Sequence, residues 1–479
     1  MSLFKSFKPT RLAKKDGFFS AEEYKMKSLI LCCFLSIFSL TYGAKLTTSS
    51  LPFHKRLDLT LLNDTIYSNI YYEDLEYEIV KIQMLSNMND NGDEEKSLNV
   101  FAFGEDISLK LREDEDLNNR ILPAKTFMMT DKKFEEIIFE NNDTIRVYQD
   151  LEQKAAFSIV YRETGNFEME GTIGNLIIKP IPGDIMIYDK EFNRNYELLP
   201  YSEKQSLSAA HIVIKIRIWP DLFGFDLLYP KIQINSTGVF GPRKRKVPVV
   251  YPEIILLVDY DNYLTFDQND KRVLSYYYSV LSNIDLRYRT LRNPTVKIIL
   301  SAILIAKNKG GMPFLEKNQM NETYIEVTDT LKDFSKYLYE NSNYIRQYDI
   351  ALIMTKFSLC SRERTGECKP VIGVADGVGS ACKFSIDQEE IEGIGIVEDV
   401  GGQKSASIAA HEIAHLLGVE HDGTGSAFQC RRDVGFLMDS VYRSAVYERE
   451  WSECSRQQFS RFLNSPEAKC LYNYPNRRY

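Results

Sequence analysis

Residues 405–422 read SASIAAHEIAHLLGVEHD, and this stretch holds three of the five histidines of the 479-residue chain. Its first part is rich in alanine, leucine and glutamate, which favour an α-helix. Ser405 or Ser407 is expected to cap the start of that helix. His411 and His415 are four residues apart, so a helix places them one above the other on one face.

The residues around these two histidines complete the pattern of a catalytic zinc site. Two imidazoles at this spacing can bind one zinc ion, and Glu412 lies beside them, where it can take a proton from a water that the metal activates. Gly418 can adopt a left-handed conformation at the helix end, which lets the chain turn and return His421 as a third ligand. Three protein ligands leave one position open for water, as in catalytic rather than structural zinc sites.

The alternative is a buried helix whose histidines have no common purpose. A bare pair of histidines around a glutamate occurs by chance in many proteins and does not exclude this alternative. Three histidines within eleven residues are hard to explain without a metal, because a buried histidine needs polar partners. His54 and His211 have no such neighbours in the sequence and are expected to be ordinary surface or core residues.

The extended motif, which includes Gly418 and His421, resembles the metzincin signature HExxHxxGxxH followed by a methionine turn. Asp422, directly after the third histidine, is similar to the reprolysin (adamalysin) branch of the metzincins. This branch includes snake-venom metalloproteases, the ADAM proteases and secreted tick salivary metalloproteases. The resemblance covers roughly residues 249–473 and implies a metzincin catalytic domain with a zinc cleft.

The resemblance also implies roles for other segments. Met438, which lies 17 residues after His421, corresponds to the methionine turn and would form a hydrophobic floor under the zinc ligands. Residues 251–259 are similar to the family's first strand, residues 373–375 to its substrate-binding edge strand, and residues 393–399 to the segment before the active-site helix. A single buried methionine is usually only part of a core, so the assignment of Met438 depends on its order and position.

The C-terminal half of the chain also shows its fold class in its hydrophobic pattern. Continuous apolar runs predict buried strands, and apolar residues at helical spacing predict helices. Strands are expected at residues 251–259, 296–305 and 349–355, and helices at residues 270–283 and 326–340. This alternation indicates an α/β arrangement with a mostly parallel, twisted sheet and covering helices.

The N-terminal half has a different character. Strand-like runs recur between polar, acidic loops, for example at residues 77–82 and 212–216. We therefore predict a β-rich domain, which the resemblance implies is a propeptide. It has no cysteine between residues 45 and 242, so it cannot silence zinc with a thiolate as many propeptides of the family do. If this domain inhibits, a carboxylate or simple occlusion of the cleft would have to take that role.

A basic cluster separates the two halves and follows the loop-forming dipeptide Gly241-Pro242. The cluster consists of Arg243, Lys244, Arg245 and Lys246. Such a cluster in an exposed loop would suit a proprotein convertase, although it ends in lysine rather than arginine; the alternative is a solvated basic turn. Its position favours cleavage, which divides the chain into a propeptide domain at residues 45–246 and a catalytic domain at residues 247–479.

A targeting segment begins at Met26. A lysine at its start, an apolar run at residues 29–40 and small residues up to Ala44 describe a secretory signal peptide at residues 26–44. Residues 1–25 are then an upstream extension, with translation starting at Met26. The rival is an uncleaved signal anchor, but the run is shorter than the about 20 apolar residues that a membrane span needs. No later segment is long and apolar enough, so we expect no stable membrane anchor.

Cysteines and glycosylation sequons agree with export. Six cysteines lie outside the signal, all in the C-terminal third, as in disulfide-bonded secreted proteins. Their spacing does not choose among the possible pairings. The resemblance implies bonds between Cys382 and Cys470 and between Cys430 and Cys454, which leaves Cys360 with Cys368. Sequons begin at Asn63, Asn142, Asn235 and Asn321.

The resemblance further implies a calcium site near the termini of the catalytic domain. Its ligands would be Glu253, Asp349, Cys470 through its backbone carbonyl, and Asn473. Carboxylate, amide and carbonyl oxygens suit a hard cation. The alternative is that these are ordinary surface charges, which scattered acidic residues usually are.

Together these features predict a secreted zinc-dependent metalloendopeptidase that is made as a zymogen and cleaves extracellular proteins. The net charge of −8 gives no basic excess for nucleic acid. One rival is a catalytically silent binding protein with the same fold, which would normally have lost Glu412 or a ligand. Another is a secreted toxin or inhibitor with structural zinc, which would need a fourth protein ligand at suitable spacing. The substrate would lie extended along residues 373–375 by β-augmentation.

Overall fold

The computed structural model describes residues 76–474, apart from gaps at 89–93, 132, 139–143, 163–166, 182–209, 216–223, 228–247, 346, 363–365, 386 and 442–449. The chain divides into two units, residues 1–53 and 54–479, and every described residue belongs to the second. The predicted signal, the basic cluster, His54 and the sequons at Asn63, Asn142 and Asn235 lie outside the described residues. Among the described residues, no helix is long and apolar enough to cross a membrane.

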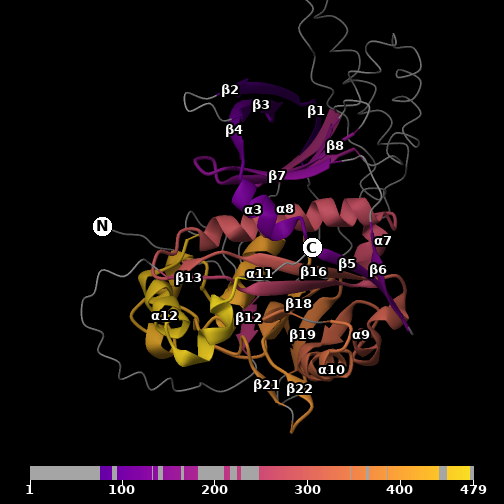
Figure 1. Cartoon of the computed structure of the whole chain (residues 1–479), viewed down its shortest axis with the longest axis vertical. Coiled ribbons are helices and arrows are strands. Elements are labelled where there is room, and N and C mark those ends of the chain that lie inside the picture. Colours follow the sequence, from indigo (N-terminus) through magenta and orange to yellow (C-terminus); the bar gives the residue numbers. More distant parts are fainter. Residues whose placement is uncertain are drawn as a thin grey trace, which may run out of the picture. The chain divides into compact units, whose positions relative to one another are not determined.

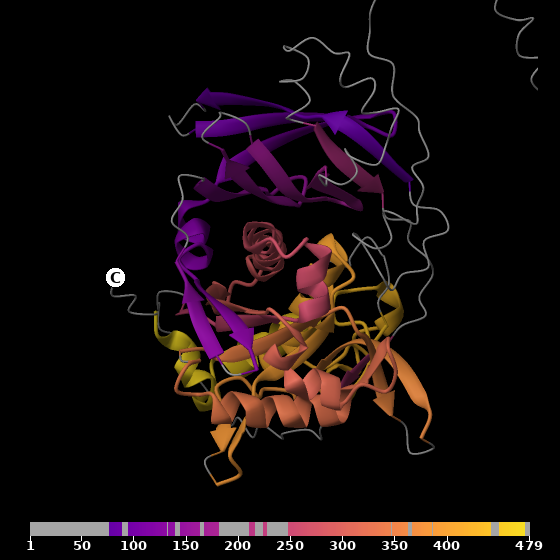
Figure 2. The same cartoon turned by 90° about the vertical axis from the view of Figure 1, so that its right-hand side faces the viewer.

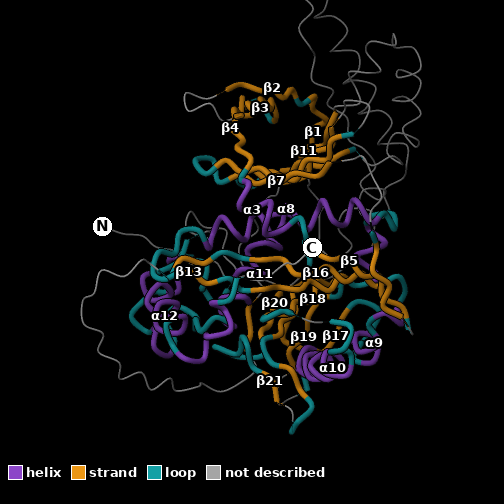
Figure 3. The backbone as a smooth tube through the Cα atoms, viewed as in Figure 1, coloured by secondary structure: helices purple, strands orange, loops and turns teal. Residues whose placement is uncertain are grey.

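The N-terminal region is a nine-stranded antiparallel sheet that curls into a half-barrel (Figure 3). Its strands, in sheet order, are β1 (Glu76–Lys81), β11 (Ala210–Lys215), β10 (Leu176–Pro180), β9 (Phe167–Ile173), β8 (Ala155–Tyr161), β7 (Thr144–Asp150), β4 (Glu105–Glu113), β3 (Glu94–Ala102) and β2 (Gln83–Met88). Alternate side chains point into a shared core that includes Leu98, Leu109 and Phe157. The predicted β-rich N-terminal region is confirmed.

The second sheet has ten strands and carries the site (Figure 1). Its order is β17 (Tyr324–Glu326), β19 (Ser358–Arg362), β20 (Cys368–Ala375), β23 (Ile394–Glu398), β18 (Ile350–Thr355), β14 (Glu253–Val258), β16 (Ile299–Ala306), β5 (Lys125–Thr130) and β6 (Lys133–Ile137), and β12 (Gly224–Leu227) pairs with β20. Strands β23, β18, β14, β16 and β5 run parallel, whereas β20 is antiparallel to β23. The predicted mostly parallel α/β sheet is confirmed.

Strand β14 is buried on both faces, which explains its continuous apolar sequence. Ile254 and Leu256 pack into a cluster with the helices α8 (Asp270–Tyr288) and α11 (Gly402–Leu416). Ile255, on the opposite face, packs into a second cluster with α10 (Val327–Glu340). The helices thus cover the two faces of the sheet and place α11 beside β20 and β23.

Smaller elements complete the chain. They are α3 (Glu115–Ile121), α7 (Tyr260–Thr265), α9 (Pro313–Lys317), α12 (Glu453–Leu463), β13 (Val249–Val250), β15 (Thr295–Val296), β21 (Phe384–Ser385), β22 (Glu390–Ile391), η1 (Lys309–Gly311), η2 (Gly425–Ala427), η3 (Arg432–Val434) and η4 (Pro466–Tyr472). The structure contains the disulfides Cys360–Cys368, Cys382–Cys470 and Cys430–Cys454, the same pairs that the sequence analysis expected.

Candidate active site

The helix α11 begins three residues earlier than Ser405, the nearer of the two caps that the sequence predicted. Its N-cap is Gly401, which has a φ of 95° and no capping side chain, so the prediction of a serine cap was wrong. Ser405 lies inside the first turn, where its Oγ accepts a hydrogen bond from Gly401 N (2.7 Å) and donates one to Asp399 Oδ1 (2.7 Å). Asp399 also accepts hydrogen bonds from the hydroxyls of Tyr276 and Tyr277 on α8 (2.6 and 2.8 Å). This buried carboxylate therefore fixes the start of the helix.

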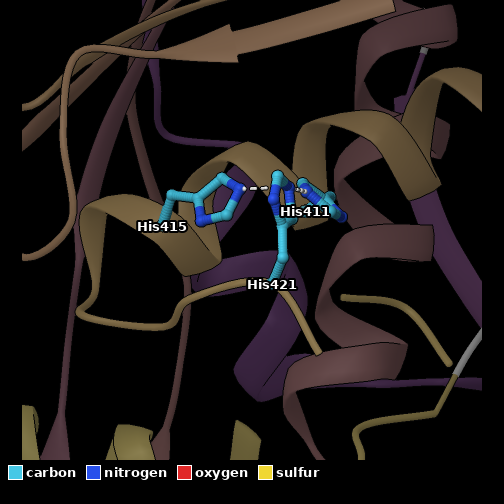
Figure 4. Close-up of side chains that lie close together, drawn as sticks. All are labelled: His411, His415 and His421. Atoms are coloured by element: carbon cyan, nitrogen blue, oxygen red, sulfur yellow. Dashed lines mark hydrogen bonds between the residues drawn. The ribbon is translucent and has the colours of Figure 1, made fainter. Parts of the chain in front are cut away.

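The three histidines of the motif meet at one point (Figure 4). The Nε2 atom of His421 lies 3.1 Å from Nε2 of His411 and 3.1 Å from Nε2 of His415. All three rings are buried. Burial lowers the pKa of each imidazole, to about 4 for His415, so the neutral form that binds metals is favoured.

Backbone carbonyls set the direction of two of these rings. His411 Nδ1 lies 2.6 Å from Leu437 O, and His415 Nδ1 lies 2.7 Å from Val419 O. A carbonyl oxygen can only accept, so in each neutral ring the proton is on Nδ1 and the lone pair is on Nε2. The Nε2 lone pairs of His411 and His415 therefore point at Nε2 of His421, so three ring nitrogens surround one point that a cation could occupy. This donor set fits zinc, which would be held by His411, His415 and His421 with a fourth position left open.

The turn after the helix returns His421 to the other two ligands. Gly418 has a φ of 90°, as the sequence predicted for a left-handed glycine. A side chain there has no room, because an added Cβ would lie 2.4 Å from the Cβ of Phe462 on α12. After His421, Asp422 N donates to Met438 O (2.9 Å), and Ser452 Oγ donates to Asp422 Oδ1 (2.6 Å). The turn is thus held from two sides.

Met438 lies in the segment that supports the ligands. Its side chain is fully buried, and the carbonyl of the preceding Leu437 is the one that orients His411. Asp422 and Met438 are joined by the backbone hydrogen bond described above, so the third ligand and the methionine segment are directly connected. These positions agree with the role that the resemblance implies for Met438.

Glu412 lies against strand β20. A Cβ added to Gly373 would be 2.4 Å from Glu412 Oε1 and 2.8 Å from Ile408 Cγ2. Only glycine leaves this space for the carboxylate, which is buried one residue after the first ligand. The edge of β20 and the proposed proton acceptor are therefore neighbours, as cleavage of a strand-bound peptide requires.

The strand β12 was not predicted from the sequence. It pairs in parallel with β20, with Gly224 opposite Val371, Asp226 opposite Val374 and Leu227 opposite Ala375. The stretch is only four residues long, so the alternation of its apolar residues Phe225 and Leu227 is too short to predict a strand. The pattern therefore gave no signal that this segment lies beside the proposed catalytic residues.

Three of the four residues of the candidate calcium site lie near one another at the start of β14, although the contacts between them do not involve the Glu253 carboxylate or the Cys470 carbonyl. Glu253 N donates to Asp349 Oδ2 (3.0 Å), and a carboxylate oxygen of Asp349 lies within 4.8 Å of the sulfur of Cys470. Burial raises the pKa of Asp349 to about 6. Asn473 follows η4 directly as its C-cap residue. His211, in contrast, is an ordinary core residue, whose Nε2 accepts from Met169 N (2.9 Å).

A histidine pair on a helix, a third histidine after a tight turn and a strand, β20, that runs antiparallel to β23 in a mostly parallel sheet are together the features of a zinc metalloprotease catalytic domain. Residues 250–475 match the reprolysin (M12B) family of zinc metalloproteases.

Individual relatives agree with this assignment. The chain is 30% identical over 432 residues to "A disintegrin and metalloproteinase with thrombospondin motifs like" of Bombyx mori, covering 79% of this chain and 62% of that protein. It is 24% identical over 341 residues to "Venom metalloproteinase 3" of Eulophus pennicornis (69% of this chain, 74% of the relative). It is 26% identical over 239 residues to "Snake venom metalloproteinase fibrolase" of Macrovipera lebetinus (49% and 99%). The chain thus spans less than two thirds of the Bombyx mori protein.

Proposed function

We propose that this protein is a secreted zinc metalloendopeptidase that hydrolyses peptide bonds in extracellular proteins and is made as a zymogen. The observation that carries the proposal is the convergence of three buried imidazole nitrogens next to Glu412, beside strand β20. A catalytically silent relative would not be expected to keep both the three histidine ligands and the proton acceptor Glu412. Secretion is supported by three disulfides, which persist in oxidising compartments.

The proposed mechanism assigns one task to each group. When bound, a zinc ion supplies a Lewis acid that polarises the scissile carbonyl and acidifies water. His411, His415 and His421 would hold the ion, and their carbonyl partners keep two of the rings in the right tautomer. Glu412 takes the proton from the attacking water and later donates it to the leaving amine. The peptide lies along β20, where Gly373 leaves room for the Glu412 carboxylate.

Loss of the metal will abolish activity. With the N-terminal region removed, the protein will cleave casein, and a zinc chelator will reduce that cleavage to background. Zinc added in slight excess will restore it, because the three neutral imidazoles remain positioned by buried protein contacts. A correctly folded, zinc-loaded protein that cuts neither casein nor a peptide library would instead support a binding function for the same fold.

Latency is proposed to come from the strand β12. A substrate that adds a strand to β20 needs the same backbone groups that β12 uses opposite Val371, Val374 and Ala375. Occupation of this edge explains how a region without cysteine between residues 45 and 242 can keep the site closed. Cleavage at Arg243, Lys244, Arg245 or Lys246 would then cut the chain between β12 and the first catalytic strand.

Weakening the β12 pairing will therefore raise the activity of the uncut chain. A Gly224→Pro/Phe225→Pro double variant removes the backbone N–H groups of the first two of the four strand residues. Loss of one hydrogen bond, worth about 0.5–1.5 kcal/mol, will increase the open fraction by about 2- to 12-fold. Initial rates on a short fluorogenic peptide measure this, with Phe225→Val as the control that keeps its N–H. Equal rates for both variants and the parent would remove β12 from the latency mechanism.

Calcium binding at Glu253, Asp349, Cys470 and Asn473 is proposed as a stabilising feature. At a concentration about 100 times its Kd, calcium will stabilise the folded protein by about 2.7 kcal/mol, so the midpoint of thermal unfolding will rise. Asp349→Asn will remove most of that rise, while Asp387→Asn, at an exposed position, will keep it. An unchanged melting temperature of the parent protein at millimolar calcium would exclude the site.

A further inference from the structure

Residues from both sides of the basic cluster build one continuous structure. The N-terminal region comprises the described residues of 76–227, before the cluster, and the catalytic region comprises those of 248–474, after it. Strand β5 of the N-terminal region pairs in parallel with β16, with Lys125 to Met129 opposite Ala302 to Ala306. The backbone N of Lys307 extends this pairing with a hydrogen bond to Met129 O (2.9 Å). Without β5, the edge of β16 would be left unpaired.

The helix α8 is enclosed between the two regions, as Figure 2 shows nearly end-on, where it appears as the rose helix between the two sheets. Most of its side chains are buried. One face packs on the catalytic sheet, and the other receives side chains from β7, β8 and β9. From these strands, Gln149 Nε2 donates to Ser282 O (3.0 Å) and Ser158 Oγ donates to Ser275 O (2.7 Å). The exposed face that α8 would have on a free catalytic domain does not exist here.

A buried ion pair joins the same regions. Arg120 on α3 donates to Asp285 Oδ1 on α8 (2.9 Å), and each side chain is only 1% exposed. The Arg120 guanidinium also donates to the carbonyl of Ile298 in the catalytic region. Around it, Leu117 and Ile121 are fully buried in the same hydrophobic cluster as Ile254 and α8. Separating the regions would expose this apolar surface and take Asp285 away from one of its two arginine partners.

The contact reaches the start of the active-site helix. Gly402, with a φ of 55°, lies so close to β10 that an added Cβ would be 2.8 Å from Ile177 Cδ1 and 3.3 Å from Thr172 Cγ2 on β9. Thr172 Oγ1 also donates to Asn283 Oδ1 on α8 (3.1 Å). The N-terminal region thus touches both α8 and the helix that carries His411, in addition to the β12 pairing on β20.

We infer that the N-terminal region remains bound to the catalytic region as a non-covalent complex after the chain is cut at residues 243–246. The α8 face and the β16 edge are then an interaction surface whose partner is the chain's own N-terminal region. Cutting alone leaves β12 on the substrate edge, so activation requires a second event that removes or destroys the N-terminal region. The consequence for activation rests on the proposed zymogen, whereas the persistence of the complex after cutting does not.

The test replaces Arg243, Lys244, Arg245 and Lys246 in the full chain with the recognition site of a sequence-specific protease. After complete cutting, the two fragments are expected to elute together from a gel-filtration column at micromolar concentration, also in 1 M salt. The cut complex is expected to cleave casein at less than about a tenth of the rate of the free catalytic fragment. That free fragment is obtained by digesting the N-terminal fragment away. Two separate peaks after cutting would overturn the inference.

Matched variants connect the complex to the observed contacts. Arg120→Ala removes a fully buried cross-region ion pair, and we expect its cut complex to dissociate at least about tenfold faster in a surface-plasmon assay. Lys154→Ala removes an exposed cross-region pair with Glu450, whose side chains are 47% and 42% exposed, and will change the rate less than threefold. If Arg120→Ala does not fold, Gln149→Ala replaces it with the same expectation. Identical dissociation rates for the buried and exposed variants would contradict this interface.

The two proposals fail in different ways. A stable complex whose freed catalytic fragment cuts nothing would refute the proposed protease and leave the interaction in place. Fragments that separate on cutting and release full activity would refute the inference and leave the protease in place.

Discussion

A Glu412→Gln variant will lose proteolytic activity by about 10²- to 10⁴-fold, the range that a positioned general base usually contributes. Glutamine keeps the shape and burial of the side chain but cannot accept the proton of the attacking water. The loss is expected in kcat rather than KM, because the variant leaves β20 and Gly373 unchanged. Progress curves on a fluorogenic peptide, with the N-terminal region removed from both proteins, measure the two constants.

The zinc content separates this role from a structural one. Glu412 is not a ligand in the proposed site, so the variant will retain one zinc per chain and the melting temperature of the parent. A matched control is Glu420→Gln, which changes a nearby carboxylate that bonds to Ser426 N (2.6 Å) and lies outside the histidine cluster. If Glu412→Gln keeps more than about a tenth of the parent's kcat, another group moves the proton.

The zinc cluster could be predicted because its geometry is almost entirely local. The spacing of His411 and His415 fixes their common face through the helix period alone. The return of His421 needs only one residue that tolerates a positive φ, and Gly418 supplies it. The largely parallel sheet was also predictable, because strands such as β14 are covered on both faces and read as continuous apolar runs.

The parts that were missed depend on contacts far apart in the chain. No local pattern in Lys125–Thr130 indicates that it pairs with β16, some 180 residues later in the sequence. The start of α11 was placed too late because a buried carboxylate, Asp399, anchors it through Tyr276 and Tyr277. A serine inside a helix was therefore read as a cap, although its hydroxyl belongs to that tertiary network.

These distant contacts change the view of the N-terminal region. The sequence suggests a separate domain that ends at a basic cluster. In the structure, β5 joins the sheet of the catalytic region through β16, and α8 packs in one core with residues from both sides of that boundary. A region so joined to the catalytic sheet can hold the substrate edge closed with a strand as short as β12. The N-terminal region then needs no side chain that binds the metal in order to block the substrate site, because the contacts of the whole region fix the position of β12.

A Gly418→Ala variant will lose zinc binding although every ligand remains. The alanine must adopt a φ of 90°, a left-handed conformation that costs about 1–3 kcal/mol for a non-glycine residue. Its Cβ would also lie 2.4 Å from the Cβ and 2.5 Å from the Cγ of Phe462, and relief of such overpacking costs about 1–3 kcal/mol more. The turn that carries His421 must therefore shift, which separates the third imidazole from the other two.

The measurements are zinc retention after dialysis against a weak chelator and the midpoint of thermal unfolding. Gly104→Ala is the matched control, since Gly104 has a φ of 77° but no atom within 4 Å of an added Cβ. That variant bears only the cost of the left-handed backbone conformation, about 1–3 kcal/mol, and will keep its zinc. A Gly418→Ala/Phe462→Ala double variant removes the clash and is expected to recover part of the zinc affinity. Full zinc retention in Gly418→Ala would mean that the turn can shift without moving His421.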